Sequence, residues 1–237
     1  MKKVVILLKT HKWSTSIETF AKKILSDISG QNIDFFILLH DDTLELYNLI
    51  NPSIQIHVKR FCTKDIVSIY EKGFYSMWLS NHWILMWFYR ENKYDYYWSV
   101  EYDVRISGNS NILWKSELDH DFLYPTGNYL NARNKYNDYY IGGKLGPLQK
   151  FYGYLQLARY SLRFLDYLNE SYEGGENGQD ELVTFSLLNR GGFKGSKEFL
   201  KGMIGGVWTS QLKYGEFNKK QFEKTRTELR IFHPVKE

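Results

Sequence analysis

Short apolar runs alternate with helix-forming segments through the first half of the chain. The apolar runs have the length and composition of β-strands and occupy residues 4–9, 33–40, 54–58 and 94–106. Between them, residues 15–27 carry apolar side chains at helical spacing, residues 63–72 can form a helix, and residues 74–90 are apolar around most of a helix circumference. Strands that alternate with helices form a largely parallel sheet with helices on its faces. The sequence therefore predicts an α/β fold with a mostly parallel or mixed central sheet flanked by helices.

The second half of the chain is less regular. Residues 122–125 have the composition of a strand, and Pro147 opens a long helical pattern that extends to about Asn169. A Gly-rich loop at 173–178 precedes a short predicted helix at 180–189. A chain of 237 residues without an internal repeat or a long linker fits one domain. We therefore expect a single domain over the whole chain.

Two carboxylates, Glu101 and Asp103, lie at the end of the last strand predicted in the first half. The strand before them carries Trp98 and Val100, and burying an unpaired carboxylate beside such residues is costly. Residues two apart on an extended chain point to the same side, so both carboxylates can bind one hard divalent cation. Ligands of open α/β sheets bind at this carboxyl end of the strands. The motif predicts a metal site, and the alternative is an exposed acidic turn.

The octet W-S-V-E-Y-D-V-R at residues 98–105 resembles the acid-x-acid motif of GT-A glycosyltransferases, and a group of glycosyltransferase-like proteins has nearly the same octet. The resemblance covers most of the chain in the order of elements. It implies a single Rossmann-like GT-A domain, in which residues 1–106 bind a nucleotide sugar and residues 107–237 bind the acceptor. It also implies Mn²⁺ or Mg²⁺ as cofactor, with Asp103 as a direct ligand. Glu101 replaces the commoner Asp, and it serves as a second ligand or contacts the donor ribose or a metal-bound water.

The same resemblance implies nucleotide-binding roles for residues near the ends of the first two strands. Thr10 follows the first strand, and Asp41 and Asp42 follow the second. Carboxylates can accept hydrogen bonds from base N–H groups and ribose hydroxyls. The alternative for the two acids is capping of a helix at 44–49. Arg105 either contacts the donor diphosphate or pairs with Glu101.

The C-terminal sequence I-F-H-P-V-K resembles the metal-binding end of many GT-A enzymes. This resemblance implies that His233 ligates the metal and that Lys236 contacts the diphosphate. Imidazole is a good ligand for manganese-like ions, and an ammonium group can neutralise a leaving diphosphate. The alternative is a frayed chain terminus.

Acidic residues also follow the Gly-rich loop, in the sequence E-G-G-E-N-G-Q-D-E-L at residues 173–182. In inverting GT-A enzymes a carboxylate at this point deprotonates the acceptor hydroxyl, and Asp180 matches it best, with Glu181 as the alternate. The family more often has Glu-Asp where this chain has Gln179 and Asp180. The alternative is that these acids only stabilise the start of a helix. Trp208 either stacks on a sugar or belongs to the core.

Composition excludes several classes of protein. With 31 basic and 27 acidic residues, the net charge of +4 is too small to predict a nucleic-acid partner, although it permits peripheral contact with an anionic membrane. The single cysteine, Cys62, excludes an internal disulfide and a multi-cysteine zinc site. The apolar runs at 4–8 and 83–89 are too short for a signal-peptide core and a transmembrane helix. We therefore expect a cytoplasmic protein without a membrane span.

Together these features predict a metal-dependent glycosyltransferase of glycan biosynthesis. The expected donor is a nucleotide-diphosphate sugar, with a UDP-sugar favoured, and the expected acceptor is a hydroxyl group of a glycan or glycolipid. One alternative is a nucleotidyltransferase that acts on sugar phosphates, but residues 11–14 lack the glycines typical of its nucleotide loop. The other is a non-catalytic sugar- or nucleotide-binding module, which an aromatic content of 17% suits.

Overall fold

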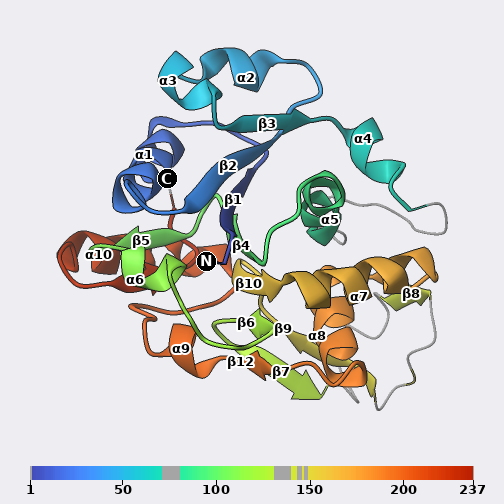
Figure 1. Cartoon of the computed structure of the whole chain (residues 1–237). Helices are drawn as coiled ribbons and strands as arrows, with labels where there is room; N and C mark the ends of the chain where they lie inside the picture. The colour runs from blue at the N-terminus through green and yellow to red at the C-terminus, as the bar shows by residue number, and fades with distance from the viewer. Residues whose placement is uncertain (1, 71–80, 131–139, 143–145, 147–148, 237) are drawn as a thin grey trace.

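A seven-stranded sheet forms the centre of the computed structural model, which describes residues 2–70, 81–130, 140–142, 146 and 149–236 (Figure 1). Its strands, in spatial order, are β12 (Gly195–Ser196), β6 (Phe122–Leu123), β10 (Leu157–Ser161), β4 (Tyr96–Glu101), β1 (Val4–Thr10), β2 (Ile33–His40) and β3 (Val58–Phe61). Strand β10 is antiparallel to both neighbours, and the other neighbouring pairs are parallel. The predicted α/β fold with a mostly parallel central sheet is confirmed.

Helices cover both faces of this sheet. The longer ones are α1 (Thr15–Asp27), α5 (His82–Glu91), α7 (Leu162–Glu173), α8 (Asp180–Arg190) and α10 (Gly215–Lys224). The short ones are α2 (Glu45–Leu49), α3 (Pro52–Gln55), α4 (Thr63–Val67), α6 (Asn111–Trp114), α9 (Glu198–Lys201) and the 3₁₀ turn η3 (Leu212–Tyr214). In the part of the chain that the structure describes, no helix is both long and apolar enough to cross a membrane.

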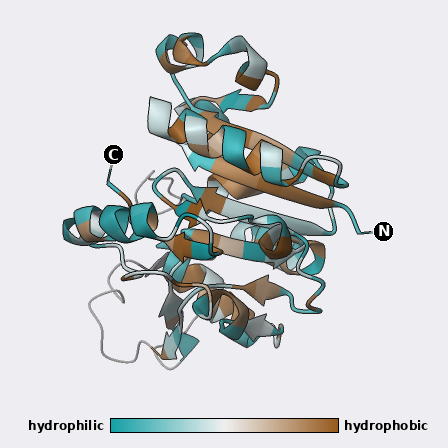
Figure 2. Cartoon of the chain, turned by 90° about the vertical axis from the view of Figure 1, so that its left-hand side faces the viewer, coloured by the Kyte–Doolittle hydropathy of each residue, from teal (hydrophilic) through white to brown (hydrophobic). Residues whose placement is uncertain are grey.

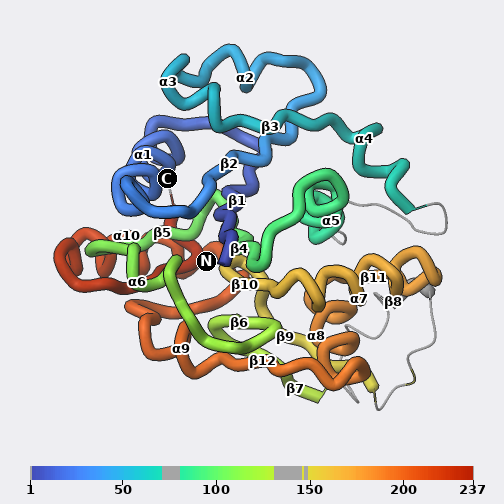
Figure 3. The backbone as a smooth tube through the Cα atoms, viewed as in Figure 1, coloured from blue at the N-terminus to red at the C-terminus, as the bar shows by residue number. Residues whose placement is uncertain are grey.

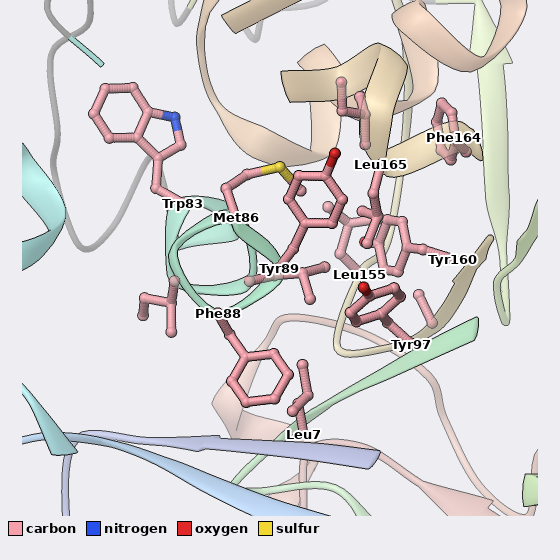
Figure 4. Close-up of a cluster of buried hydrophobic side chains, with 14 of the residues drawn as sticks. Leu7, Trp83, Met86, Phe88, Tyr89, Tyr97, Leu155, Tyr160, Phe164 and Leu165 are labelled. Atoms are coloured by element: carbon pink, nitrogen blue, oxygen red, sulfur yellow. The ribbon is translucent and has the colours of Figure 1, made fainter. Parts of the chain in front are cut away.

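The side chains of β1 alternate between two hydrophobic cores, as the two-residue period of a strand requires. Val5 and Leu7 face the core that α5, α7 and α8 close, and Ile6 and Leu8 face the core that α1 closes. The first core is rich in aromatic rings, which Figure 4 shows around α5. Hydrophobic residues accordingly concentrate on the central strands in Figure 2. A strand buried on both faces reads as the unbroken apolar run seen in the sequence.

Among the described strands, three smaller antiparallel pairs lie outside the central sheet. They are β5 (Arg105–Ser107) with β13 (Arg230–Phe232), β7 (Gly127–Leu130) with β9 (Phe151–Gly153), and β8 (Tyr140–Gly142) with β11 (Asn177–Gly178). The first pair matters most for function, because it places the C-terminal segment beside the turn that follows β4.

Two predicted strands differ from the structure in their bounds. Residues 54–58 are not one strand, because Pro52 begins α3, the Asn51 side chain caps it, and β3 starts only at Val58. The run 94–106 is divided, since the Val104 N–H donates to the Glu101 carbonyl and forms a turn between β4 and β5. The predicted helix at 74–90 is observed from His82 onward, and residues 74–80 lie outside the described part.

The helix predicted from Pro147 to about Asn169 is wrong over residues 151–161 and confirmed over residues 162–169, and residues 147–148 lie outside the described part. Strands β9 and β10 occupy its first part, and helix α7 begins only at Leu162, where the Ser161 hydroxyl accepts a hydrogen bond from the Phe164 N–H. Tertiary pairing overrides the helical spacing here, because β10 fills the position in the sheet between β4 and β6. At the start of α1, the Ser14 side chain accepts a hydrogen bond from the Ile17 N–H and caps the helix.

Candidate active site

The candidate site lies where the chain changes direction across the sheet. From β1 the chain moves to β2 and β3 on one side, and it then returns to place β4 on the other side of β1, as the tube in Figure 3 shows. The crevice between the carboxyl ends of two such strands is the usual ligand site of an open α/β sheet. Here Lys9 near the end of β1 is in register with Glu101 at the end of β4.

Three side chains converge at this point: Glu101, Asp103 and His233. One ligand atom of each lies within 4.8 Å of the other two. His233 Nε2 is 3.4 Å from Asp103 Oδ1 and 4.0 Å from Glu101 Oε2. The pairing of β5 with β13 brings the C-terminal segment here, and the Val235 N–H donates to the Asp103 carbonyl over 2.9 Å. The structure therefore brings together the three residues that the sequence predicts as metal ligands.

The surroundings of these three groups fit a hard divalent cation. Asp103 Oδ1 is buried and has no hydrogen-bond partner among the described residues, and the imidazole nitrogen that faces it is His233 Nε2. Burial raises the pKa of Glu101, and Asp103 adds to this against the opposing charge of Lys9. Burial also acts to raise the pKa of Asp103, but His233 outweighs it and the net pKa is lowered. Two carboxylates and an imidazole form a ligand set suited to Mn²⁺ or Mg²⁺.

Lys9 is a site residue that the sequence reasoning missed. Its side chain is only 6% exposed, and its Nζ is 3.9 Å from Glu101 Oε1. Burial raises the pKa of Asp180 and lowers that of His82, and the charge of Lys9 acts to lower both. A lysine inside an otherwise apolar strand was the available signal, because an unpaired ammonium is rarely buried.

Asp180 and Glu181 lie in the first turn of α8, and the charge of Lys9 acts on Asp180. Asp180 is buried and accepts hydrogen bonds from the His82 N–H over 3.1 Å and from the Glu181 N–H over 2.8 Å. Burial raises the pKa of Asp180 to about 7, with Lys9 opposing and Glu101 adding to the rise. Burial, Asp180 and Glu101 likewise raise the pKa of Glu181. Glu101, a predicted metal ligand, thus contributes to the raised pKa of both predicted base candidates.

Glu181 is held by a second residue that the sequence reasoning missed, Gln156. Its side-chain amide donates to Glu181 Oε1 over 2.9 Å, and its backbone carbonyl accepts from the Glu101 N–H over 2.8 Å. Gln156 Oε1 is buried without a partner among the described residues. One residue therefore links the end of β4 to the start of α8 and presents an acceptor oxygen beside them.

The three predicted nucleotide contacts near β1 and β2 make local hydrogen bonds. The Thr10 hydroxyl bonds to the backbone of Lys12. Asp41 is buried and accepts from the Tyr47 N–H over 2.9 Å. Asp42 accepts from the Thr63 N–H over 2.7 Å. Asp41 thus caps the start of α2, as the alternative interpretation expected, whereas Asp42 caps the start of α4 instead. Nucleotide binding by Thr10, Asp41 and Asp42 stays a prediction.

The two predicted diphosphate contacts differ in position. Arg105 is buried and donates to the carbonyls of Tyr102 and Val104, over 2.6 and 2.8 Å, so it supports the turn that carries Asp103. Lys236 is exposed, and its Nζ is 3.6 Å from a carboxylate oxygen of Glu216. A diphosphate role for either residue stays a prediction.

The Trp208 ring packs against the metal-ligand candidate. Its centroid is 5.4 Å from that of the His233 imidazole. The indole N–H is buried and has no hydrogen-bond partner among the described residues. The ring therefore belongs to the wall of the site, and sugar stacking by Trp208 stays a prediction.

Comparison with known proteins gives a likeness in structure only. No protein-family model matches the sequence, and no curated protein matches it. The chain is similar to the galactosyltransferase LgtC, solved with donor and acceptor sugar analogues, at 13% identity over 96% of this chain and 85% of that one, with a TM-score of 0.46. It is also similar to the inositol-1-phosphate CTP transferase of T. maritima, at 10% identity over 82% and 84% of the two chains, with a TM-score of 0.48.

A third similar structure is the apo form of the glycosyltransferase GlyE of Streptococcus pneumoniae, at 15% identity. The match covers 99% of this chain but 55% of that one, with a TM-score of 0.43. Similar structures thus include both of the transferase classes that the sequence suggested. At these identities and TM-scores, the likeness assigns neither activity to this chain.

Proposed function

We propose that this chain is a metal-dependent glycosyltransferase. It would move a sugar from a nucleotide-diphosphate sugar, with a UDP-sugar favoured, to a hydroxyl group of a glycan or glycolipid. The observation that carries the proposal is the convergence of Glu101, Asp103 and His233 at the switch point of the sheet. Asp103 Oδ1, which faces His233 Nε2, is buried without a hydrogen-bond partner in the described chain, and a bound cation would satisfy it.

On the donor side, Asp103 and His233 would hold Mn²⁺ or Mg²⁺, and Glu101 would ligate it or orient a bound water. When bound, the cation supplies positive charge to the departing nucleoside diphosphate. Arg105 fixes the turn that carries Asp103, so the ligand geometry is set before the donor arrives. Lys236 is proposed to reach the diphosphate from the C-terminal segment.

On the acceptor side, Asp180 is proposed as the general base of an inverting reaction. A carboxylate with a pKa raised to about 7 holds a proton more strongly than an ordinary Asp and can still ionise near neutral pH. The two N–H donors on Asp180 fix the orientation of its carboxylate. Glu181, which Gln156 holds beside it, is the alternate base. Lys9 favours the ionised form of Asp180 that proton transfer requires.

A product assay tests this proposal. The purified chain is incubated with UDP-sugars, Mn²⁺ and hydroxyl acceptors, and release of UDP and of pyrophosphate is measured separately. Release of UDP that stops in Asp103→Ala supports a glycosyltransferase. Release of pyrophosphate from a nucleoside triphosphate and a sugar phosphate would identify a nucleotidyltransferase instead. Sugar binding that needs no metal and gives no product would identify a binding module.

A further inference from the structure

We infer that Asn218 of α10 is a positioning residue that holds His233 in place through the backbone around it. The side chain of Asn218 is fully buried. Its Nδ2 donates to the carbonyls of Val207 and Pro234, each over 2.9 Å, and its Oδ1 accepts from the Val207 N–H over 3.0 Å. One amide therefore joins the loop around Val207 to the residue directly after His233.

The loop around Val207 and the C-terminal segment both approach the Asn218 amide closely. A Cβ atom added at Gly206 would lie 2.3 Å from Asn218 Oδ1, a distance that real Cβ atoms essentially never show. The Thr209 N–H also donates to the His233 carbonyl, and the Trp208 ring packs on the imidazole. Glycine at 206 thus lets the loop approach, and the loop then lies against His233.

The metal-ligand candidate lies outside the ladder of its strand. Strand β13 ends at Phe232, so His233 is the first residue beyond the ladder of β5 and β13. Helix α10 lies beside β5 (Figure 1), and the buried residues of this helix are Gly215 and Asn218. The Asn218 amide is therefore a buried polar group through which α10 acts on the segment that carries His233.

Loss of this amide would change the site without touching a ligand atom. Truncation would leave the Val207 N–H and the Val207 and Pro234 carbonyls without their buried partner, and unpaired buried groups drive local rearrangement. The carbonyl of Pro234 is one residue from the imidazole. Outer partners of metal ligands act in this way, by setting orientation, and their loss typically lowers metal affinity about 10- to 100-fold.

This inference rests on the proposed metal site, and calorimetric titration of the full chain with Mn²⁺ alone tests it. For Asn218→Ala we expect about 10-fold weaker Mn²⁺ binding than for wild type. The matched control is Gln55→Ala, because the Gln55 amide also donates to two backbone carbonyls, those of Tyr47 and Ile50, away from the site. The control should lose thermal stability but keep wild-type Mn²⁺ affinity.

A second variant protects the test against misfolding. Gly206→Ala should displace the Asn218 amide by its added Cβ and weaken Mn²⁺ binding in the same direction. If Asn218→Ala does not fold, Gly206→Ala decides the question. Wild-type Mn²⁺ affinity in a folded Asn218→Ala chain would overturn the inference but not the proposed metal site. The same result in Gly206→Ala would do so if Asn218→Ala does not fold. Absence of Mn²⁺ binding to the wild-type chain would overturn both.

Discussion

Acidic side chains follow both β2 and β4, the two strands that flank β1, yet their surroundings are opposite. Asp41 and Asp42, after β2, accept hydrogen bonds from backbone N–H groups that cap nearby helices. For Asp41 burial acts to raise the pKa, but these hydrogen bonds outweigh it and the pKa is lowered. Glu101, the last residue of β4, has Lys9 at 3.9 Å and accepts a hydrogen bond from the Asn81 side-chain amide over 3.3 Å, and burial raises its pKa.

This difference separates a structural acid from one that is available to a ligand. A carboxylate that accepts several N–H bonds is stable as an anion and needs no further cation. A carboxylate enclosed with other acids is stable only when it takes a proton or a cation. A position at the carboxyl end of a strand is therefore insufficient to identify a site residue. The hydrogen-bond partners of each acid show whether its carboxylate is available to a ligand.

The largest expected effect is at Asp103. We predict that Asp103→Asn lowers turnover by about 1,000-fold or more, because the charge stabilisation that a metal gives to a leaving group amounts to several kcal/mol. Calorimetry with Mn²⁺ should show binding lost as well. Asp42→Asn, a change at one of the capping acids after β2, is the control and should bind Mn²⁺ like wild type. Equal Mn²⁺ affinities in Asp103→Asn and wild type would contradict the assignment.

The next effect is at Asp180. We predict that Asp180→Asn lowers kcat by about 100-fold or more, within the range for loss of a general base. The wild-type rate should rise with pH through about 7, since only the ionised carboxylate accepts a proton. That rise should be absent from the residual activity of the variant. A pH–rate profile of Asp180→Asn with the wild-type inflection would exclude this residue as the base.

Asp180 should also make stability depend on pH. Its pKa is raised in the folded chain, so the folded state binds a proton more strongly than the unfolded state does. The stability from this proton is fully present below the unfolded pKa, near 4, and is lost as pH rises through about 7. Urea unfolding across this window should show wild type losing stability relative to Asp180→Asn, by an amount on the order of 4 kcal/mol.

A smaller effect is expected at Lys9. We predict that Lys9→Met moves the inflection of the pH–rate profile to higher pH, because the lysine charge lowers the pKa of Asp180. Methionine keeps much of the length and apolar surface of the lysine stem, so the fold should be retained. Lys12→Met, a change at a neighbouring lysine, serves as the control. An inflection that moves to lower pH, or not at all, would show that Lys9 does not act on the base.

The smallest catalytic effect is expected for the capping acids. Asp41→Asn should lower the free energy of unfolding by about 1 kcal/mol, typical of a lost cap, while Mn²⁺ affinity stays unchanged. Asp42 is more exposed, and its substitution should matter less for stability. Chemical denaturation measures the first quantity and calorimetry the second. Weaker UDP binding in either variant would instead support the nucleotide-binding role that the sequence resemblance implies.

Much of the sheet could be predicted from the sequence, because strands β1, β2 and β4 are buried on both faces and read as apolar runs. The strand β10 could not, since its residues fit a helical period as well as a strand, and only its place between β4 and β6 decides. The acids at 101 and 103 were also visible, because they interrupt an apolar run. For Asp41 and Asp42 the sequence left two interpretations open, nucleotide binding and helix capping, and it did not indicate that Asp42 caps α4.

The sequence by itself determined the α/β architecture and the carboxylates that end β4, since both depend on local order and on hydrophobic pattern. Only the tertiary structure placed His233 beside Asp103 and Lys9 beside Glu101, and only it gave Asn218 its two partners. Those contacts join segments far apart in the chain, and no local pattern encodes them. Burial then shifts the pKa values of Glu101 and Asp180, because desolvation depends on everything that packs around a charge.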